Sequence, residues 1–375
     1  MRNQNAPVTR PTALLPETLR VVELGEAIPT ALAGQYLVKL GADVTRILPA
    51  DTASVLDTLE PRVGEGDDSR SAAAEWLRRG KSLTTVDLTD PSGLAGVEAL
   101  IAEADVVLLW GTEAEWSARG LAPDRVAELA PSAVVGRVTP WGDGGPYTGF
   151  PDTELAFQAT SGFMKLVGVL DREPVRLGGY ALQGAAGLLA LDGVMIGLFR
   201  RENTGQGARF TTSELEAAAH VEWKIATFVQ AGMRRELRGE DGGGPAAVRC
   251  RDGFFGMFFM PRHWPDVKAI IGAPGLEDER FATPEGRHEH LAELVAIVEE
   301  STRTRSKLDL YQEFQAKDIP AGYVATLSDL RTSPQYVERR FFEPVSVDGV
   351  GTGELPAAPW QVLTPEDVSG EGAVA

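Results

Sequence analysis

The segment Asp105-Val-Val-Leu-Leu-Trp110 decides the fold. Its nearly continuous apolar run is typical of a strand that is covered on both faces, as strands of a parallel sheet are. Residues 92–104, just before it, have apolar side chains at helical spacing, and residues 132–139 repeat the apolar strand pattern. Strands separated by helices of this length predict right-handed crossovers between parallel strands.

The same alternation continues upstream. Residues 19–24 have the β-branched centre of a strand, residues 30–40 have helical spacing, and residues 42–48 are expected to form the next strand. Gly41 follows the helix at a position where glycine commonly ends one. The sequence therefore predicts an α/β fold with a doubly wound large domain around a parallel sheet.

The amino-acid composition changes after Gly242-Gly-Gly-Pro245, where the chain becomes rich in aromatic residues. The expected elements are helices over 185–200, 213–232 and 285–301 and strands over 249–260 and 321–326. We expect the strand over 321–326 to return the chain to the first sheet. We predict the first part of a large domain at 17–205, a linker helix at 206–221, a small domain at 222–318, a return to the large domain at 319–363, and tails at 1–16 and 364–375.

Composition excludes several classes of partner. The 375 residues include 36 Lys and Arg against 54 Asp and Glu, a formal net charge of −18, which disfavours a nucleic-acid partner. Cys250 is the only cysteine, so neither an intrachain disulfide nor a cysteine-based metal site can form. No apolar run approaches the roughly 18–20 residues that span a bilayer, and residues 1–10 lack the hydrophobic stretch of a signal peptide. We expect a cytoplasmic protein without a membrane partner.

Three familiar kinds of site are unsupported. Gly64-Glu-Gly66 and Gly142-Asp-Gly-Gly-Pro146 lack the spacing and the Lys of a phosphate-binding loop. His288 and His290 lie two residues apart, which on a helix points them to different faces. A Gly-x-Ser-x-Gly motif, which serine hydrolases of the α/β class need, does not occur. We expect neither a metal nor a nucleotide cofactor.

A set of short phrases follows in order between Arg20 and Ala321. They are Arg20-Val-Val-Glu-Leu24, Leu40-Gly-Ala-Asp-Val44, Leu77-Arg-Arg-Gly-Lys-Ser-Leu83, Val86-Asp-Leu88, Ala104-Asp-Val-Val107, Thr139-Pro-Trp-Gly-Asp-Gly-Gly-Pro-Tyr147, Gln158-Ala-Thr-Ser-Gly162, Arg201-Glu-Asn-Thr-Gly-Gln-Gly207, Asp278-Glu-Arg-Phe-Ala-Thr283 and Asp318-Ile-Pro-Ala321. This ordered set resembles the class III CoA-transferases, the CaiB/BaiF family that includes formyl-CoA transferase.

The resemblance implies a Rossmann-like large domain, a smaller α+β domain, and a homodimer of interlocked subunits. It implies that coenzyme A or an acyl-CoA is a substrate, together with a carboxylic acid. In the family, a carboxylate of the enzyme attacks the thioester to form a mixed anhydride, and the released CoA thiolate converts this to an enzyme-bound thioester. Such nucleophilic catalysis requires an ionised Asp or Glu.

Gln183 stands at the position of that carboxylate. The family's nucleophilic Asp lies near the start of the helix that leads to Arg-x-x-Thr-Gly-x-Gly, and the register counted back from Thr204-Gly205 reaches Gln183. A neutral amide cannot form the anhydride, and nothing acidic lies between Glu173 and Asp192. We predict that Gln183 instead donates an amide N–H to the thioester carbonyl oxygen.

Protons must then be moved by other residues. Glu154 stands where the family usually has an Asp beside the site, and Tyr180 is close to Gln183 in sequence. We expect Glu154 or Tyr180 to act as the acid or base. Family racemases use a His where this chain has Thr153, so both of their bases are absent and racemisation by that mechanism is not expected.

The resemblance also implies a set of CoA-binding residues, namely Ala27, Pro29, Lys81, Trp110, Gly111, Thr139, Gly242, Gly243 and Gly244. Several depart from the family pattern: Ala27-Ile-Pro29 replaces a Gly-Pro turn, and Trp110-Gly111 replaces an Asn-aromatic pair. Lys81 is expected either to face a CoA phosphate or to be a solvated surface residue. The run of glycines at 242–244 resembles a closing lid, and a plain flexible linker is the alternative.

Two functions from different classes follow. The first is an acyl-CoA-directed enzyme that transfers CoA between carboxylates or, given Gln183, catalyses a related hydrolysis, elimination or rearrangement of a thioester. The second is a non-catalytic acyl-CoA-binding or structural subunit that forms a heteromer with an Asp-bearing paralogue.

Overall fold

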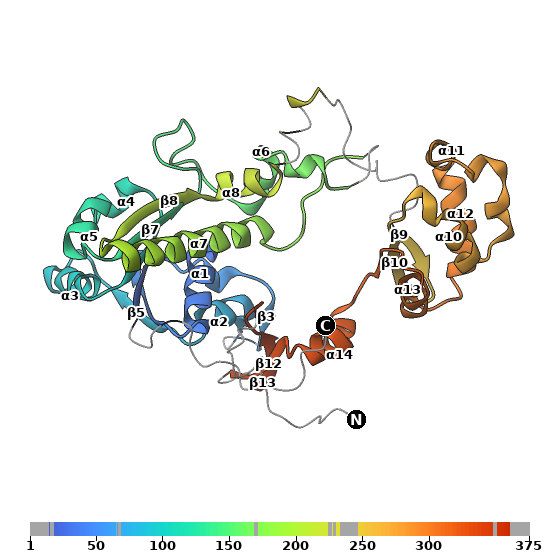
Figure 1. The fold of residues 1–375 in the computed structure, drawn as a ribbon. Coiled ribbons are helices and arrows are strands. Elements are labelled where there is room, and N and C mark those ends of the chain that lie inside the picture. The colour runs from blue at the N-terminus through green and yellow to red at the C-terminus, as the bar shows by residue number, and fades with distance from the viewer. Residues whose placement is uncertain are drawn as a thin grey trace. The chain divides into compact units, whose positions relative to one another are not determined.

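The computed structural model describes residue 15 and residues 19–64, 66, 69–168, 172–223, 227, 230–232, 247–347 and 351–360. The chain divides into two compact units, shown as ribbons in Figure 1. The first unit consists of Met1–Gly168, Arg172–Arg234 and Phe341–Ala375, and the second of Val169–Asp171 and Arg235–Arg340.

The first unit is built on a six-stranded parallel sheet with the order β5-β2-β1-β6-β7-β8. Its strands are β1 (Arg20–Leu24), β2 (Asp43–Pro49), β5 (Ser82–Val86), β6 (Val106–Trp110), β7 (Val134–Thr139) and β8 (Ala208–Ser213). The chain first adds β2 and β5 on one side of β1 and then β6, β7 and β8 on the other. The strand order therefore reverses between β1 and β6, and open parallel sheets bind ligands beyond the carboxyl ends of their strands at such a point.

Helices cover both faces of this sheet. On one face, Val21, Val44 and Val106 pack against α1 (Ile28–Lys39) and α7 (Ala181–Thr204), which lie side by side in Figure 1. On the other face, Val22 and Val107 pack with α3 (Pro91–Ala102), α4 (Glu113–Ala118) and α5 (Pro123–Leu129). Successive side chains of a strand point to opposite faces, so a strand covered on both sides must be apolar throughout. The predicted α/β class and its parallel sheet are confirmed.

The long helix α7 lies very close to the sheet. The ring of Phe210 fills the space between Gly136 of β7 and Gly193 of α7, where an added Cβ would come within 2.3 Å and 2.6 Å of the ring. By length and composition the 24-residue helix could cross a membrane, which the sequence analysis did not anticipate. Its buried residues, among them Ala190 and Val194, belong instead to the core beneath the sheet.

The other elements of the first unit are shorter. They are β3 (Arg62–Val63), β4 (Arg70–Ser71), α2 (Ala72–Arg78), α6 (Glu154–Thr160), α8 (Glu214–Val221), β12 (Phe342–Val347) and β13 (Gly351–Pro356). The predicted linker helix at 206–221 is wrong over its first half, because Ala208–Ser213 form β8, the edge strand of the main sheet, and only Glu214–Val221 are helical, as α8. A half-exposed edge strand lacks the continuous apolar run that marked the central strands.

The second unit contains a small antiparallel sheet and a group of helices. The strands are β9 (Ala247–Cys250), β10 (Gly253–Met257) and β11 (Ala321–Tyr323), and the helices are α10 (Trp264–Ile271), α11 (Pro284–Glu289), α12 (Leu291–Thr302), α13 (Lys307–Gln315), α14 (Leu327–Thr332) and α15 (Pro334–Glu338). The expectation that 321–326 joins the first sheet is wrong, because β11 pairs with β10. The chain re-enters the first unit at Phe341.

Candidate functional site

A cavity of about 740 Å³ opens beyond the carboxyl ends of β1, β6 and β7, and residues of the first unit line it throughout. Gly25 and Gly111, which follow β1 and β6, have φ angles of 82° and 110°. This left-handed region favours glycine. A Cβ on Gly111 would also come within 2.6 Å of the Glu115 carboxylate. The cavity thus lies at the switch point of the sheet, and its volume is in the range of small-molecule sites.

The N-terminus of α7 reaches the cavity and is capped by Glu154 from α6. Glu154 is 5% exposed. Its Oε1 accepts from the backbone N–H of Leu182 at 3.0 Å and from the side chain of Gln158 at 2.9 Å, and its Oε2 accepts from the backbone N–H of Gln183 at 3.1 Å. A carboxylate at a helix N-terminus satisfies unpaired N–H groups and is stabilised by the helix dipole. Glu154 therefore fixes the start of α7, and these three hydrogen bonds leave it poorly placed to move protons.

Gln183, two residues into α7, lines the cavity and pairs with a carboxyl group that the sequence analysis missed. Its Nε2 donates to Oε1 of Glu214 at 2.9 Å. Glu214 is the first residue of α8 and is 0% exposed, and its Oε2 has no hydrogen-bond partner among the described residues. Burial raises the pKa of Glu214 from 4.5 to about 8, while the hydrogen bond from Gln183 lowers it and the carboxylates of Asp152 and Glu154 raise it further. Burial among these carboxylates therefore favours the protonated form of Glu214.

Asp152 is a second carboxyl group that the sequence analysis did not single out. It lies on the loop before α6 and lines the cavity together with Tyr180 and Gln183. Desolvation by the surrounding chain raises the pKa of Asp152 although the residue is exposed, and the nearby Glu115 carboxylate adds to this effect. A carboxylate with a raised pKa that faces a cavity is suited to accept a proton.

Apart from Lys81, the predicted CoA-binding residues divide into three groups. Ala27, Trp110 and Gly111 line the cavity, as the predicted catalytic residues Glu154, Tyr180 and Gln183 do. Pro29 is buried at the start of α1, and Thr139 is 1% exposed with its Oγ1 accepting from the Gly142 backbone at 3.0 Å. Neither is among the cavity-lining residues. Gly242, Gly243 and Gly244 lie outside the described residues.

Lys81 points into the core rather than towards the cavity. Its side chain has 0% exposure, and Nζ donates to Oε2 of Glu23 at 2.6 Å and to the carbonyl oxygen of Ala31 at 2.8 Å. Burial lowers the pKa of Lys81, and the Glu23 carboxylate opposes that effect. A fully buried ammonium group offers no surface to a phosphate, so the position of Lys81 supports neither a phosphate contact nor a solvated surface residue.

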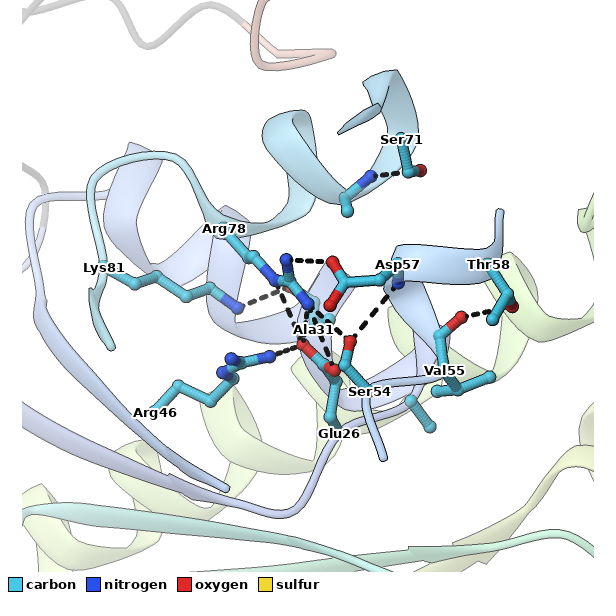
Figure 2. A network of polar contacts seen from close by, with 12 residues as sticks. Glu26, Ala31, Arg46, Ser54, Val55, Asp57, Thr58, Ser71, Arg78 and Lys81 are labelled. Carbon is cyan, nitrogen blue, oxygen red and sulfur yellow. Dashed lines mark hydrogen bonds and ion pairs between the residues drawn. The ribbon is translucent and has the colours of Figure 1, made fainter. Parts of the chain in front are cut away.

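Beside Lys81 lies a network of charged residues, shown in Figure 2. Arg78 donates to Oε1 of Glu26 at 2.9 Å and to Asp57 at 2.5 Å, and Arg46 forms an ion pair with the same Glu26. Glu26 also lines the cavity. The network fixes the chain that follows β1. Among the described residues, no group of three or more His, Cys, Asp or Glu is arranged to hold a metal ion.

Comparison with known proteins confirms the resemblance. The model of CoA-transferase family III matches residues 17–369. Formyl-CoA:oxalate CoA-transferase of Streptomyces avermitilis is 27% identical over 336 residues, which cover 84% of this chain and 81% of the relative. Subunit BbsE of succinyl-CoA:(R)-benzylsuccinate CoA-transferase from Thauera aromatica is 27% identical over 300 residues, with coverage of 76% and 73%. The structure of a CAIB/BAIF family protein from Brucella suis has a TM-score of 0.80 at 25% identity, with coverage of 92% and 91%. The chain therefore belongs to CoA-transferase family III.

Proposed function

We propose that this chain is an enzyme that acts on an acyl-CoA thioester bound in the cavity of the first unit. The observation that carries the proposal is the amide of Gln183. One N–H of its Nε2 is held by Glu214, and the second N–H has no acceptor among the described residues. Gln183 lines the cavity, so this N–H is available to a ligand. Fixed donors of this kind stabilise the negative charge that develops on a carbonyl oxygen under attack.

The proton transfers belong to Asp152 or Tyr180 rather than to Glu154. Glu154 already accepts three hydrogen bonds at the start of α7. Asp152 lines the same cavity as Gln183, and desolvation there raises the pKa of its carboxyl group, which makes it a stronger base. This arrangement suits general-base chemistry on the thioester, that is hydrolysis, elimination or rearrangement, and CoA transfer between carboxylates is the family alternative.

Turnover of a panel of acyl-CoAs tests the proposal. Acetyl-CoA, succinyl-CoA and formyl-CoA are incubated with the protein, with and without acetate, succinate or oxalate, and the products are identified by mass spectrometry. We expect wild type to consume at least one thioester and Gln183→Ala to do so roughly 10²–10³-fold more slowly, as for the loss of one oxyanion donor. Gln206→Ala, an exposed Gln beyond the far end of α7, is the matched control. Equal rates in all three proteins would contradict the proposal.

A non-catalytic role is the second candidate, and one observation favours it. The relative from Thauera aromatica is named as a subunit of its CoA-transferase, and this name supports the alternative. Under this alternative, Gln183 marks a subunit without a nucleophile, paired with an Asp-bearing paralogue. Binding of acetyl-CoA without turnover, with activity appearing only when the paralogue is added, would establish it.

We further propose a cytoplasmic homodimer, as the family resemblance implies. Interlocked subunits cannot separate without unfolding, so dilution should not release a folded monomer. Mass photometry at nanomolar concentration measures this, and a folded monomer there would show that the subunits are not interlocked.

A further inference from the structure

The contact between Gln183 and Glu214 joins two helices at the cavity. Gln183 belongs to the first turn of α7, and Glu214 is the first residue of α8, after Ser213 caps that helix by accepting from the backbone of Glu216. The two helices pack against each other, and Glu214 lies wholly beneath the surface while Gln183 reaches the cavity. A buried carboxyl group therefore accepts a hydrogen bond from the side-chain amide of a residue that lines the cavity.

We propose that Glu214 is a positioning residue that holds the Gln183 amide with its second N–H towards the cavity, and that it does so in its neutral, protonated form. This inference rests on the proposed function of Gln183 as a donor to the thioester carbonyl. Glu214 itself does not line the cavity, so it acts through Gln183 and not on the substrate.

The surroundings of Glu214 favour the neutral acid. Its Oε1 has one donor, a neutral amide, and its Oε2 has none among the described residues. From the α6 side, the charged groups that act on it are two carboxylates, Asp152 and Glu154. Glu216, on α8 itself, is held by the Ser213 hydroxyl, and Arg209 of β8 pairs with Asp124 instead. An ionised carboxylate buried among carboxylates with a single neutral donor is strongly disfavoured.

Ionisation of Glu214 would oppose the chemistry at Gln183. Attack on the thioester places negative charge on the carbonyl oxygen that Gln183 binds. A charged Glu214 would place a second negative charge on the other side of the same Gln183 amide. Like charges repel more strongly in a partly buried site than in water. Because burial raises the pKa of Glu214 to about 8, we expect polarisation of the carbonyl to fade as the pH rises through that value.

The test uses full-length protein and acetyl-CoA labelled with ¹³C at the carbonyl carbon. Hydrogen bonding to the carbonyl moves its ¹³C resonance downfield, so the bound signal reports the Gln183 donor. We expect a downfield shift at pH 6.5 in wild type that falls towards the value of free acetyl-CoA at pH 9.5. Glu214→Gln, which keeps a neutral acceptor, should retain the shift at both pH values. Glu214→Leu, which removes the acceptor, should lose it at both, with folding checked by circular dichroism.

Each outcome bears on one part of the inference. A wild-type shift that is equal at pH 6.5 and 9.5, or one that Glu214→Leu retains, would overturn the positioning role. If acetyl-CoA does not bind at all, the proposed function fails for this thioester, and infrared difference spectra then decide on Glu214 alone. In these spectra, wild type minus Glu214→Gln should contain a protonated-carboxyl band at pH 6.5 that disappears as the pH rises, with a midpoint near the pKa of about 8 to which burial raises Glu214. Absence of that band at pH 6.5 would overturn the inference.

Discussion

Replacing Glu214 by Gln should remove a large part of the pH dependence of stability. In the unfolded chain this carboxyl group has a pKa near 4.5, and in the folded chain burial raises the pKa to about 8. Between these values the folded chain keeps a proton that the unfolded chain has lost, so the unfolding free energy falls as the pH rises.

The magnitude follows from the two pKa values. Each pH unit between the unfolded and folded pKa is worth about 1.4 kcal/mol, so the interval from 4.5 to about 8 corresponds to about 5 kcal/mol by pH 9. Gln cannot ionise, so Glu214→Gln should escape this loss while it keeps the contact with Gln183. The variant should match wild type near pH 4.5 and exceed it increasingly up to pH 9.

Urea unfolding at pH 5, 7 and 9 measures the effect as a difference between the two proteins, since other groups titrate in both. Glu202→Gln, which removes an exposed carboxylate from the end of α7, is the control and should follow wild type. If wild type and Glu214→Gln lose stability in parallel from pH 5 to 9, then Glu214 is ionised in the folded protein, and the reasoning about its burial is refuted.

Three other predictions follow from the same contacts. Lys81→Met should lower the unfolding free energy by about 3–5 kcal/mol, measured by urea unfolding, because it leaves the fully buried Glu23 unpaired. The double variant Lys81→Met with Glu23→Leu should recover most of this loss. If Lys81→Met lowers only the affinity for acetyl-CoA, the phosphate contact is supported instead. Glu154→Ala should lower the unfolding free energy by about 1–3 kcal/mol, since it leaves the first N–H groups of α7 unpaired, and an unchanged urea midpoint would refute its role as a cap. Free CoA should bind weakly, because Ala27 and Trp110-Gly111 replace the family turn and pair; a calorimetric Kd in the nanomolar range, about −12 kcal/mol, would contradict this.

The central strands of the large domain could be predicted because parallel strands that are buried on both faces need apolar residues at every position. Val106–Trp110 and Val134–Thr139 show this pattern, and the sequence places both within two residues of their observed bounds. The edge strand Ala208–Ser213 alternates between half-buried and exposed residues and was mistaken for part of a linker helix. Ala321–Tyr323 was recognised as a strand, but its partner residues in β10 lie 64 to 68 positions earlier in the chain, and pairing at such separation leaves no local signal.

Those residues of the candidate site that are identified by their position in the sequence could be predicted. Gln183 and Glu154 were found through the resemblance to the family, and Tyr180 through its closeness to Gln183 in sequence. All three line the cavity. Glu214 escaped notice because an acidic residue directly after Ser213 is an ordinary helix start. Its burial depends on the packing of α8 against α7, which no local pattern reveals. Lys81 was misjudged for a related reason, since Lys is rarely buried unless it is paired.

The most direct test of the central claim is a search for a covalent intermediate. The claim is that Gln183 has replaced the nucleophile and acts as a donor, so the thioester reacts without becoming attached to the protein. Wild-type protein is incubated with each acyl-CoA that it consumes, treated with borohydride or hydroxylamine, and measured as an intact protein by mass spectrometry. We expect the unmodified mass in every case. A CoA thioester on Asp152, Glu154 or any other carboxylate, located by peptide mapping, would contradict the claim and show that the nucleophile has moved.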